Sequence, residues 1–463
     1  MYKKMLSFCL LVFSLSFLTA GDQLVFPEGF LKGVGLSAYQ NGGRKTGHSN
    51  WSEFEQSFIA INAKTFFGPA IKNNERVGRA CGFWDNAFKD IDLIQELGCN
   101  TFRFSIEWAE IEPVEGCFNY AMLDFYERFV DELLARGIKP MITLYHFVHP
   151  YWFEHKGAFE KEKGISYFVR YCKVVFERLG KKVDLWCTIN EPTVSSACGY
   201  VLGIHPPGKF GYFKQAGRVL LNLLNAHVSV YKALKKMPGG KEAQIGLVHQ
   251  LLQFEAYNPE QSSNKFFGSL RNFSGAPLAQ FFNFAFAHDV VKRFLATGHF
   301  YYEVPGPFSK PIKRCNPDAP RSYDFIGLNY YSRVVFGPGP TNYPGQVMTD
   351  MEYPVRPETL YEAIANIAEL GVPIYITENG LADAQDAYRA EFIKGYLSMV
   401  HKAIQDGYDV RGYYYWTLMD NFEWNDGYSM KFGLYDVDFK SQKRTLRAGA
   451  LPYRDWFKVA PCA

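Results

Sequence analysis

The stretch at residues 183–192, VDLWCTINEP, is an apolar segment that ends in asparagine, glutamate and proline. Its β-branched and aromatic residues favour a buried strand, and the proline ends it. Seven other stretches share this character, and with the first they predict eight strands. The seven are FLKGVGLSAYQ (30–40), NTFRFSIEW (100–108), KPMITLYHF (139–147), QIGLVHQL (244–251), YDFIGLNYY (323–331), PIYITENG (373–380) and VRGYYYWTLMD (410–420).

Helical patterns alternate with these strands. In residues 122–137, Phe125, Phe129 and Leu133 recur at every fourth position, and residues 88–98 show a related spacing. Both segments end at glycine, a common residue just after a helix. Similar segments follow the third to eighth strands. Strands alternating with helices indicate parallel βα units, and eight such units can close into a barrel.

We therefore predict an α/β fold, a single (β/α)8 TIM barrel with elaborated βα loops, over residues 21–463. A chain of 463 residues is long enough for such a barrel with loop insertions. An open doubly wound sheet is the structural alternative, but no G-x-G-x-x-G motif follows the first strand.

The composition excludes two broad classes of protein. Hydrophobic residues make up 48% of the chain and charged residues 21%, which is typical of a large packed core rather than of disorder. The formal net charge of +3 gives no strongly basic field, so we expect no nucleic-acid partner.

The N-terminus has the pattern of a secretory signal peptide. Lys3 and Lys4 precede an apolar run at residues 5–18, and small residues then lead to Gly21. The alternative, a retained membrane anchor, needs about 20 apolar residues, and this run is shorter. We expect residues 1–20 to be a signal peptide and the protein to be secreted or periplasmic.

The nine cysteines show no C-x-x-C pair, so the sequence predicts no zinc or thioredoxin-like motif. Cys99 and Cys187 lie at or within apolar strand-like runs, where a buried free thiol is the expected state. The pairing of the other cysteines stays open at this stage.

Polar residues occupy the predicted strand ends, which in a barrel of this type surround one mouth. Glu191 ends the fourth strand and Glu378 the seventh, so the two can face each other across the barrel. Such a pair is what cleavage of a glycosidic bond requires, although strand-end glutamates also form structural ion pairs with arginine. The residues expected to converge on one pocket are Gln40, His146, Asn190, Glu191, Asn329, Glu378 and Trp416.

The motifs around these residues resemble those of glycoside hydrolase family 1, the β-glucosidase family. The resemblance runs from residue 24 to residue 457, nearly the whole chain after the predicted signal peptide. It rests on FPEGFLKGVGLSAYQ, FRFSIEW, TLYHF, TINEP, DFIGLNYYS, YITENG and YYWTLMDNFEWNDGYSMKFGLYDVDF, which occur in the family's order.

The resemblance implies a retaining double displacement. Glu378 matches the family's nucleophile, and Glu191 matches its general acid/base. Retaining enzymes hold the two carboxyl groups ~5 Å apart, so the negative nucleophile raises the pKa of the acid. Once Glu378 carries the sugar, that pKa falls and Glu191 can take a proton from water.

The resemblance also implies supporting roles for other residues. Arg103 and Tyr331 match hydrogen-bond donors to the nucleophile, and Asn329, from the same motif as Tyr331, is grouped with them. Asn190 matches a donor to the sugar 2-hydroxyl group. The residues matching those that bind the rest of the sugar are Gln40, His146, Glu423 and Trp424, with Trp416 as the stacking floor.

The sequence departs from the family's usual pattern in two places. Phe147 follows His146 where a tryptophan is common, and Glu110 stands where an arginine is common. These changes put the aglycone preference in doubt and leave the carboxylates untouched. Glu423 favours an unphosphorylated sugar, because a carboxylate there would repel phosphate. Glu191 argues against a thioglucosidase, which typically has glutamine at this position.

The sequence thus predicts an exo-β-glycosidase that releases a terminal β-D-glucosyl or related residue, with galactose and fucose left open. We expect a small β-glycoside as substrate and no metal or organic cofactor, since acid, base and nucleophile are all side chains. Two alternatives remain at this stage. One is a carbohydrate-binding protein without activity on the same fold, and the other is a transglycosidase using the same intermediate.

Overall fold

The computed structural model describes residues 24–43, 45–57, 70–262, 264–306 and 309–456. The predicted signal peptide, residues 1–20, lies outside the described residues. Eight parallel strands close into a barrel in the order β1-β13-β12-β9-β5-β4-β3-β2. Their bounds are β1 Leu31–Leu36, β2 Thr101–Ser105, β3 Lys139–Thr143, β4 Leu185–Asn190, β5 Gln244–Gln250, β9 Phe325–Asn329, β12 Ile374–Asn379 and β13 Val410–Trp416.

Each of the eight predicted strands contains one barrel strand, so the predicted barrel is confirmed. The strands are shorter than the sequence suggested. β1 ends at Leu36, and Gln40 lies on the short helix α1 (Ala38–Gly42) instead of on the strand. The chain leaves the ladder here because the backbone N–H of Ala38 donates to Ser105 Oγ (2.9 Å). β2 likewise stops at Ser105, and Trp108 begins helix α5.

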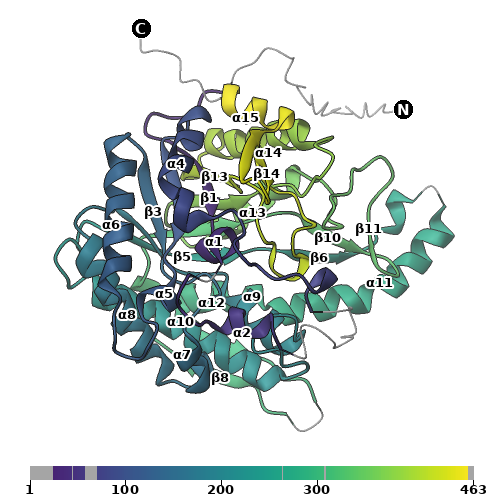
Figure 1. Ribbon diagram of the computed structural model, residues 1–463. Coiled ribbons are helices and arrows are strands. Elements are labelled where there is room, and N and C mark those ends of the chain that lie inside the picture. Colours follow the sequence, from purple (N-terminus) through teal and green to yellow (C-terminus); the bar gives the residue numbers. More distant parts are fainter. Residues whose placement is uncertain (1–23, 44, 58–69, 263, 307–308, 457–463) are drawn as a thin grey trace, which may run out of the picture.

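Helices surround the barrel, as Figure 1 shows. Glycines in the left-handed region follow α4 and α6, namely Gly98 (φ 65°) and Gly137 (φ 72°), where other residues would be strained. The longer helices are α4 Phe83–Glu96, α6 Tyr120–Ala135, α8 Gly164–Leu179, α10 Phe213–Leu234, α12 His288–Thr297, α13 Glu358–Ala368 and α14 Arg389–Gln405; the shorter ones are α2 Asn50–Phe54, α5 Trp108–Ile111, α7 Tyr151–His155, α9 Pro192–Ser196 and α15 Leu451–Trp456.

The barrel interior is packed solid near the N-terminal ends of its strands. Met141, Cys187, Val248, Phe325 and Tyr414 form part of one buried cluster there. The cluster closes the centre of the barrel, and the C-terminal mouth beyond it is where such barrels place their active sites. Cys187, like Cys99, is a buried free thiol, as the sequence predicted.

Two insertions, one between β5 and α12 and one between β9 and α13, pair with each other and extend away from the barrel, and together we call them the arm. It consists of β6 (Gln253–Ala256), β10 (Arg333–Phe336), β11 (Pro340–Thr341) and the helix α11 (Lys265–Phe286). Figure 1 shows α11 and this small sheet side by side at one edge of the molecule. Two hairpins complete the described fold, β7 (His299–Tyr302) with β8 (Ile312–Cys315), and β14 (Tyr435–Asp438) with β15 (Lys443–Leu446). Among the described helices, none has the length and apolarity to cross a bilayer.

Candidate active site

The polar residues at the C-terminal mouth line a pocket of about 340 Å³. Arg103 and Asn329 are buried and bonded to residues of this lining, and Gln40 bonds to Glu423 from α1. The structure thus brings all of the predicted site residues together. Those in the lining are His146, Asn190, Glu191, Tyr331, Glu378, Trp416, Glu423 and Trp424.

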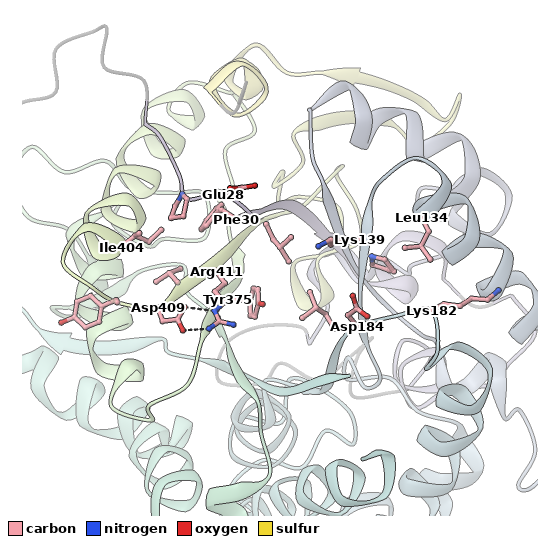
Figure 2. Close-up of a pocket in the computed structure, with 17 residues that line it drawn as sticks. Glu28, Phe30, Leu134, Lys139, Lys182, Asp184, Tyr375, Ile404, Asp409 and Arg411 are labelled. Carbon is pink, nitrogen blue, oxygen red and sulfur yellow. Dashed lines mark hydrogen bonds and ion pairs between the residues drawn. The ribbon is translucent and has the colours of Figure 1, made fainter. Parts of the chain in front are cut away.

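A second pocket of about 450 Å³ lies at the opposite, N-terminal ends of the strands (Figure 2). Its lining includes the first residues of β1, β3 and β13. Arg411 donates to both oxygens of Asp409 (2.8 and 2.9 Å), as Figure 2 shows. Lys182 pairs with Glu127 and Asp131. Because this end of such barrels serves stability, we place the active site at the other end.

Glu378 lies on β12 and is almost completely buried. One of its oxygens accepts a hydrogen bond from Arg103 Nη1 (2.6 Å), and the other accepts from the hydroxyl group of Tyr331 (2.7 Å). Arg103 is itself only 1% exposed. Burying two charges is favourable only when they are paired and further bonded, and both conditions hold here. The carboxylate is therefore fixed in one orientation beneath the pocket.

Glu191 directly follows β4 and precedes α9. Its backbone is in the left-handed region (φ 46°), which is uncommon for a residue with a side chain and is often found at functional sites. Its Oε1 accepts a hydrogen bond from Asn329 Nδ2 (2.6 Å). Burial, and then the nearby charge of Glu378, raise the pKa of Glu191 well above its ordinary value.

A chain of hydrogen bonds links the two carboxyl groups. Arg103 Nη2 donates to Asn190 Oδ1 (2.6 Å), and Asn329 Nδ2 donates to the same oxygen (3.1 Å) as well as to Glu191. The hydroxyl group of Thr377 donates to Asn329 Oδ1 (2.7 Å), which turns the NH₂ group of Asn329 toward Glu191. Sequence reasoning missed Thr377, although its place directly before Glu378 marked it as a residue of the same strand end.

Among the described residues, four buried polar atoms at the pocket have no protein partner: Gln40 Oε1, His146 Nδ1, Asn190 Nδ2 and Gln250 Oε1. Buried polar atoms are normally bonded, so such a group around one pocket indicates a polar ligand. Burial, together with the charge of Arg103, lowers the pKa of His146 well below its ordinary value. The ring is therefore neutral and offers one donor and one acceptor nitrogen, which suits a hydroxyl group.

Aromatic rings form one wall of the same pocket. The ring of His146 stacks on Trp416 (centroids 5.7 Å apart, 16° between planes) and on Trp424 (6.2 Å, 21°). The rings of Trp51 and His205 pack against Trp424, with centroids 4.4 and 6.3 Å away, and sequence reasoning did not single them out. Such faces suit the C–H faces of a sugar ring.

Glu423 and Gln40 form the polar edge next to Trp424. Gln40 Nε2 donates to Glu423 Oε2 (3.2 Å) and to the carbonyl oxygen of Phe422 (3.0 Å). Burial, followed by the charges of Asp426 and Glu378, raises the pKa of Glu423 to about 8. The edge thus presents a carboxyl group that can bond a hydroxyl group of a ligand.

The two departures from the family pattern lie at different depths. Phe147 lines the pocket and packs edge-on against Trp424 (5.5 Å, 70°). Glu110 is buried away from the lining and accepts hydrogen bonds from Lys45 and Thr46, which fix that loop. Of the two, Phe147 alone is placed to touch an aglycone.

Comparison with known proteins identifies a family for the chain. A family model described as glycosyl hydrolase family 1 matches residues 22–460. The chain is 32% identical to a protein named beta-glucosidase A of Thermotoga maritima, over 94% of this chain and 98% of that one. It is 31% identical to a 1,4-beta-D-glucan glucohydrolase of Thermotoga neapolitana, with the same coverage.

Solved structures give the same result. A beta-glycosidase from Pyrococcus horikoshii is 33% identical and superposes with a TM-score of 0.76, covering 94% of this chain and 95% of that one. A beta-glucosidase from Thermotoga maritima in complex with glucoimidazole is 30% identical, with a TM-score of 0.77 and coverage of 93% and 97%. The likeness to these structures thus extends over nearly the whole chain.

Proposed function

The chain belongs to glycosyl hydrolase family 1, and from that membership we propose that it is a retaining exo-β-glycosidase of the β-glucosidase type. One observation carries the proposal: two buried carboxyl groups, Glu191 and Glu378, line one pocket and are linked through Arg103, Asn190 and Asn329. The substrate is a terminal, non-reducing β-D-glucosyl or related residue on an aglycone. Relatives named beta-glucosidase support this substrate class.

In the first step, Glu378 acts as nucleophile. A carboxylate oxygen of Glu378 bonds to the anomeric carbon while the bond from that carbon to the glycosidic oxygen breaks. The departing oxygen takes the proton of Glu191, which the raised pKa of this group keeps in place. Arg103 and Tyr331 hold the attacking group in position.

In the second step, water releases the sugar. Glu378 has lost its negative charge in the ester, so the repulsion that raised the pKa of Glu191 is gone. Glu191, now a carboxylate, takes a proton from water. The water oxygen bonds to the anomeric carbon, and Glu378 leaves as a carboxylate. Two displacements at one carbon retain the β configuration.

The supporting residues divide between positioning and binding. Asn190 Nδ2 is free to donate to the sugar 2-hydroxyl group, because the Oδ1 of this amide is occupied by Arg103 and Asn329. Gln40, His146 and Glu423 bind the other hydroxyl groups, and Trp416 supplies the stacking face. A hydroxyl-rich ring of glucose size satisfies the buried atoms that have no protein partner.

A panel of aryl β-glycosides tests this function and the choice of sugar. We expect kcat/KM to be highest for the glucoside or a close relative such as the galactoside or fucoside. For the 6-phospho-β-glucoside we expect a kcat/KM at least about 100-fold lower, because no lysine or arginine is among the described residues that line the pocket and the phosphate charge would be buried without a partner beside Glu423. Failure to cleave any aryl β-glycoside would contradict the proposal, and preference for the phosphorylated sugar would contradict the role of Glu423.

The alternative of a carbohydrate-binding protein without activity is not favoured, because both carboxyl groups are present in a bonded arrangement.

We also propose that residues 1–20 direct the enzyme out of the cytoplasm. The charged start and the apolar run of this segment support export. Mass measurement of the mature protein from its native cell, with a loss of about 20 residues expected, tests this point.

A further inference from the structure

The aglycone side of the active-site pocket is an apolar wall. Five apolar residues of the lining come from the arm or the segment entering it, namely Leu252, Phe254, Phe282, Phe286 and Phe336. None of the polar residues of the lining belongs to the group of packed phenyl rings; outside the sugar-binding set they include Gln250, Glu352, Tyr353, Asn425 and Asp426. Phenyl and alkyl side chains offer no hydrogen bonds. A second sugar placed against this wall would bury hydroxyl groups without partners there, whereas an alkyl chain would lose nothing.

The wall is assembled before any substrate arrives. Phe282 stacks on Phe336 (5.3 Å, 10°) and on Phe254 (5.2 Å, 30°), and Phe254 also contacts Phe286 (5.3 Å). The rings come from α11, β6 and β10, so the fold of the arm fixes their mutual positions. A preformed apolar surface costs a ligand little reorganisation on binding.

The same helix turns a second apolar face toward solvent. Phe266, Phe267, Leu270 and Phe273 are between 55% and 79% exposed. Their spacing places them on one side of α11. Apolar residues that face water on a helix packed against its own protein mark a surface for another apolar body.

The inner side of α11 explains this arrangement. Gly275 lies on that side, and a Cβ there would fall 1.8 Å from the carbonyl oxygen of Phe336. The helix thus packs its glycine face tightly onto β10. Toward its C-terminal end, the inner face carries Phe282 and Phe286 of the pocket wall. One helix therefore joins the aglycone wall to the exposed apolar face formed by Phe266, Phe267, Leu270 and Phe273, which we call the tip.

We propose that the enzyme acts on amphiphilic β-glycosides, in which one sugar is joined to a long apolar tail. The tail lies along the phenyl wall of the pocket, and the exposed face of α11 enters the micelle or bilayer that holds the substrate. We choose a lipid surface as the partner of the tip because the same helix, α11, also lines the aglycone side of the pocket, where the apolar tail of the substrate would lie. This inference rests on the proposed glycosidase function and adds its substrate class.

A series of alkyl β-glucosides from ethyl to octyl, used below the concentration at which micelles form, tests the wall. We expect kcat/KM to rise with each methylene by up to about fourfold until the wall is covered. We also expect octyl glucoside to be cleaved faster than cellobiose. A flat series, with cellobiose preferred, would overturn the proposal.

The variant Phe282→Ser locates the effect. We expect it to flatten the alkyl series while leaving turnover of β-glucosyl fluoride unchanged, because fluoride has no tail to bind. An unchanged alkyl series in this variant would contradict the wall. If the wild-type enzyme did not hydrolyse β-glucosyl fluoride, the glycosidase function itself would be refuted. Failure of the apolar wall and failure of the proposed function therefore give different results.

The double variant Phe266→Ser, Phe273→Ser tests the tip. Both side chains are exposed, so the fold should be kept. We expect at least about a tenfold lower rate on phosphatidylcholine vesicles that contain a β-glucosyl diacylglycerol, with soluble ethyl glucoside unaffected. An unchanged rate on vesicles would contradict a lipid-facing role. A wild-type dimer that dissociates in this variant would show that the tip contacts a second copy, and would contradict it too.

Discussion

The variant Glu378→Ala is expected to lower kcat/KM for an aryl β-glucoside by on the order of 10⁴-fold or more. The side chain supplies the bond to the anomeric carbon, and among the described residues no other carboxyl group has the same contacts with Arg103 and Tyr331. Steady-state hydrolysis at the pH optimum measures this loss. Added azide should restore turnover by attacking from the vacated side, and should give the α-glycosyl azide.

Removing Glu378 also has a structural cost that the experiment has to separate. Arg103 is 1% exposed and would be left without its anionic partner, which destabilises proteins by about 3–5 kcal/mol. Thermal unfolding of the variant therefore accompanies the rate measurement. The variant Glu107→Gln is the control, because it removes another buried carboxyl group that lies outside the pocket. We expect the enzyme with this substitution to keep its activity. Full activity in Glu378→Ala, or inactivity without azide rescue in a folded variant, would contradict the nucleophile role.

The second large effect is expected from Glu191→Ala, and it depends on the leaving group. Substrates with poor leaving groups, such as alkyl glucosides, need the proton of Glu191, so their kcat/KM should fall by about 10³-fold. A dinitrophenyl glucoside leaves without that proton, so its kcat/KM should fall by less than about tenfold. Equal losses for both substrates would contradict the acid role.

The pH profile gives an independent test of Glu191. Its pKa is raised, and the protonated form is needed for the first step. The value of kcat/KM for an alkyl glucoside should therefore fall as the pH rises through that pKa. In Glu191→Ala this alkaline fall should disappear. Burial raises the pKa of Glu423 to about 8, so Glu423→Gln is the matched control and should keep the alkaline fall. If the alkaline fall disappeared in Glu423→Gln instead, the fall would belong to Glu423 and its assignment to Glu191 would be wrong.

The barrel could be predicted from the sequence because its strands are buried on all sides. A strand such as β4 (Leu185–Asn190) is mostly apolar and buried along its whole length, and eight such runs separated by helices leave few possible folds. The two glutamates could be predicted as well, since each follows its apolar run directly. The ends of the strands were harder to predict. The apolar character continues past β1 into α1, so Gln40 was predicted to lie on a strand although it lies on the helix.

The remaining features depend on contacts between distant segments. Phe147, Glu191 and Trp424 all have backbones in the left-handed region, and nothing in their local sequence indicates it. The arm forms because β6 pairs with β10, which lies some 80 residues later in the chain. The place of Thr377 beside Glu378 is visible in the sequence, but its hydrogen bond to the amide of Asn329 joins two strands and is not.

The central claim is that Glu378 becomes covalently bonded to the sugar. A 2-deoxy-2-fluoro-β-glucosyl fluoride tests it most directly, because the ring fluorine slows both steps while the good leaving group lets the first proceed. Mass spectrometry of the digested, inactivated enzyme should find one fluoroglucosyl group, attached to Glu378 in the peptide that contains β12 (Ile374–Asn379). A label on any other residue, or inactivation without a label, would contradict the mechanism.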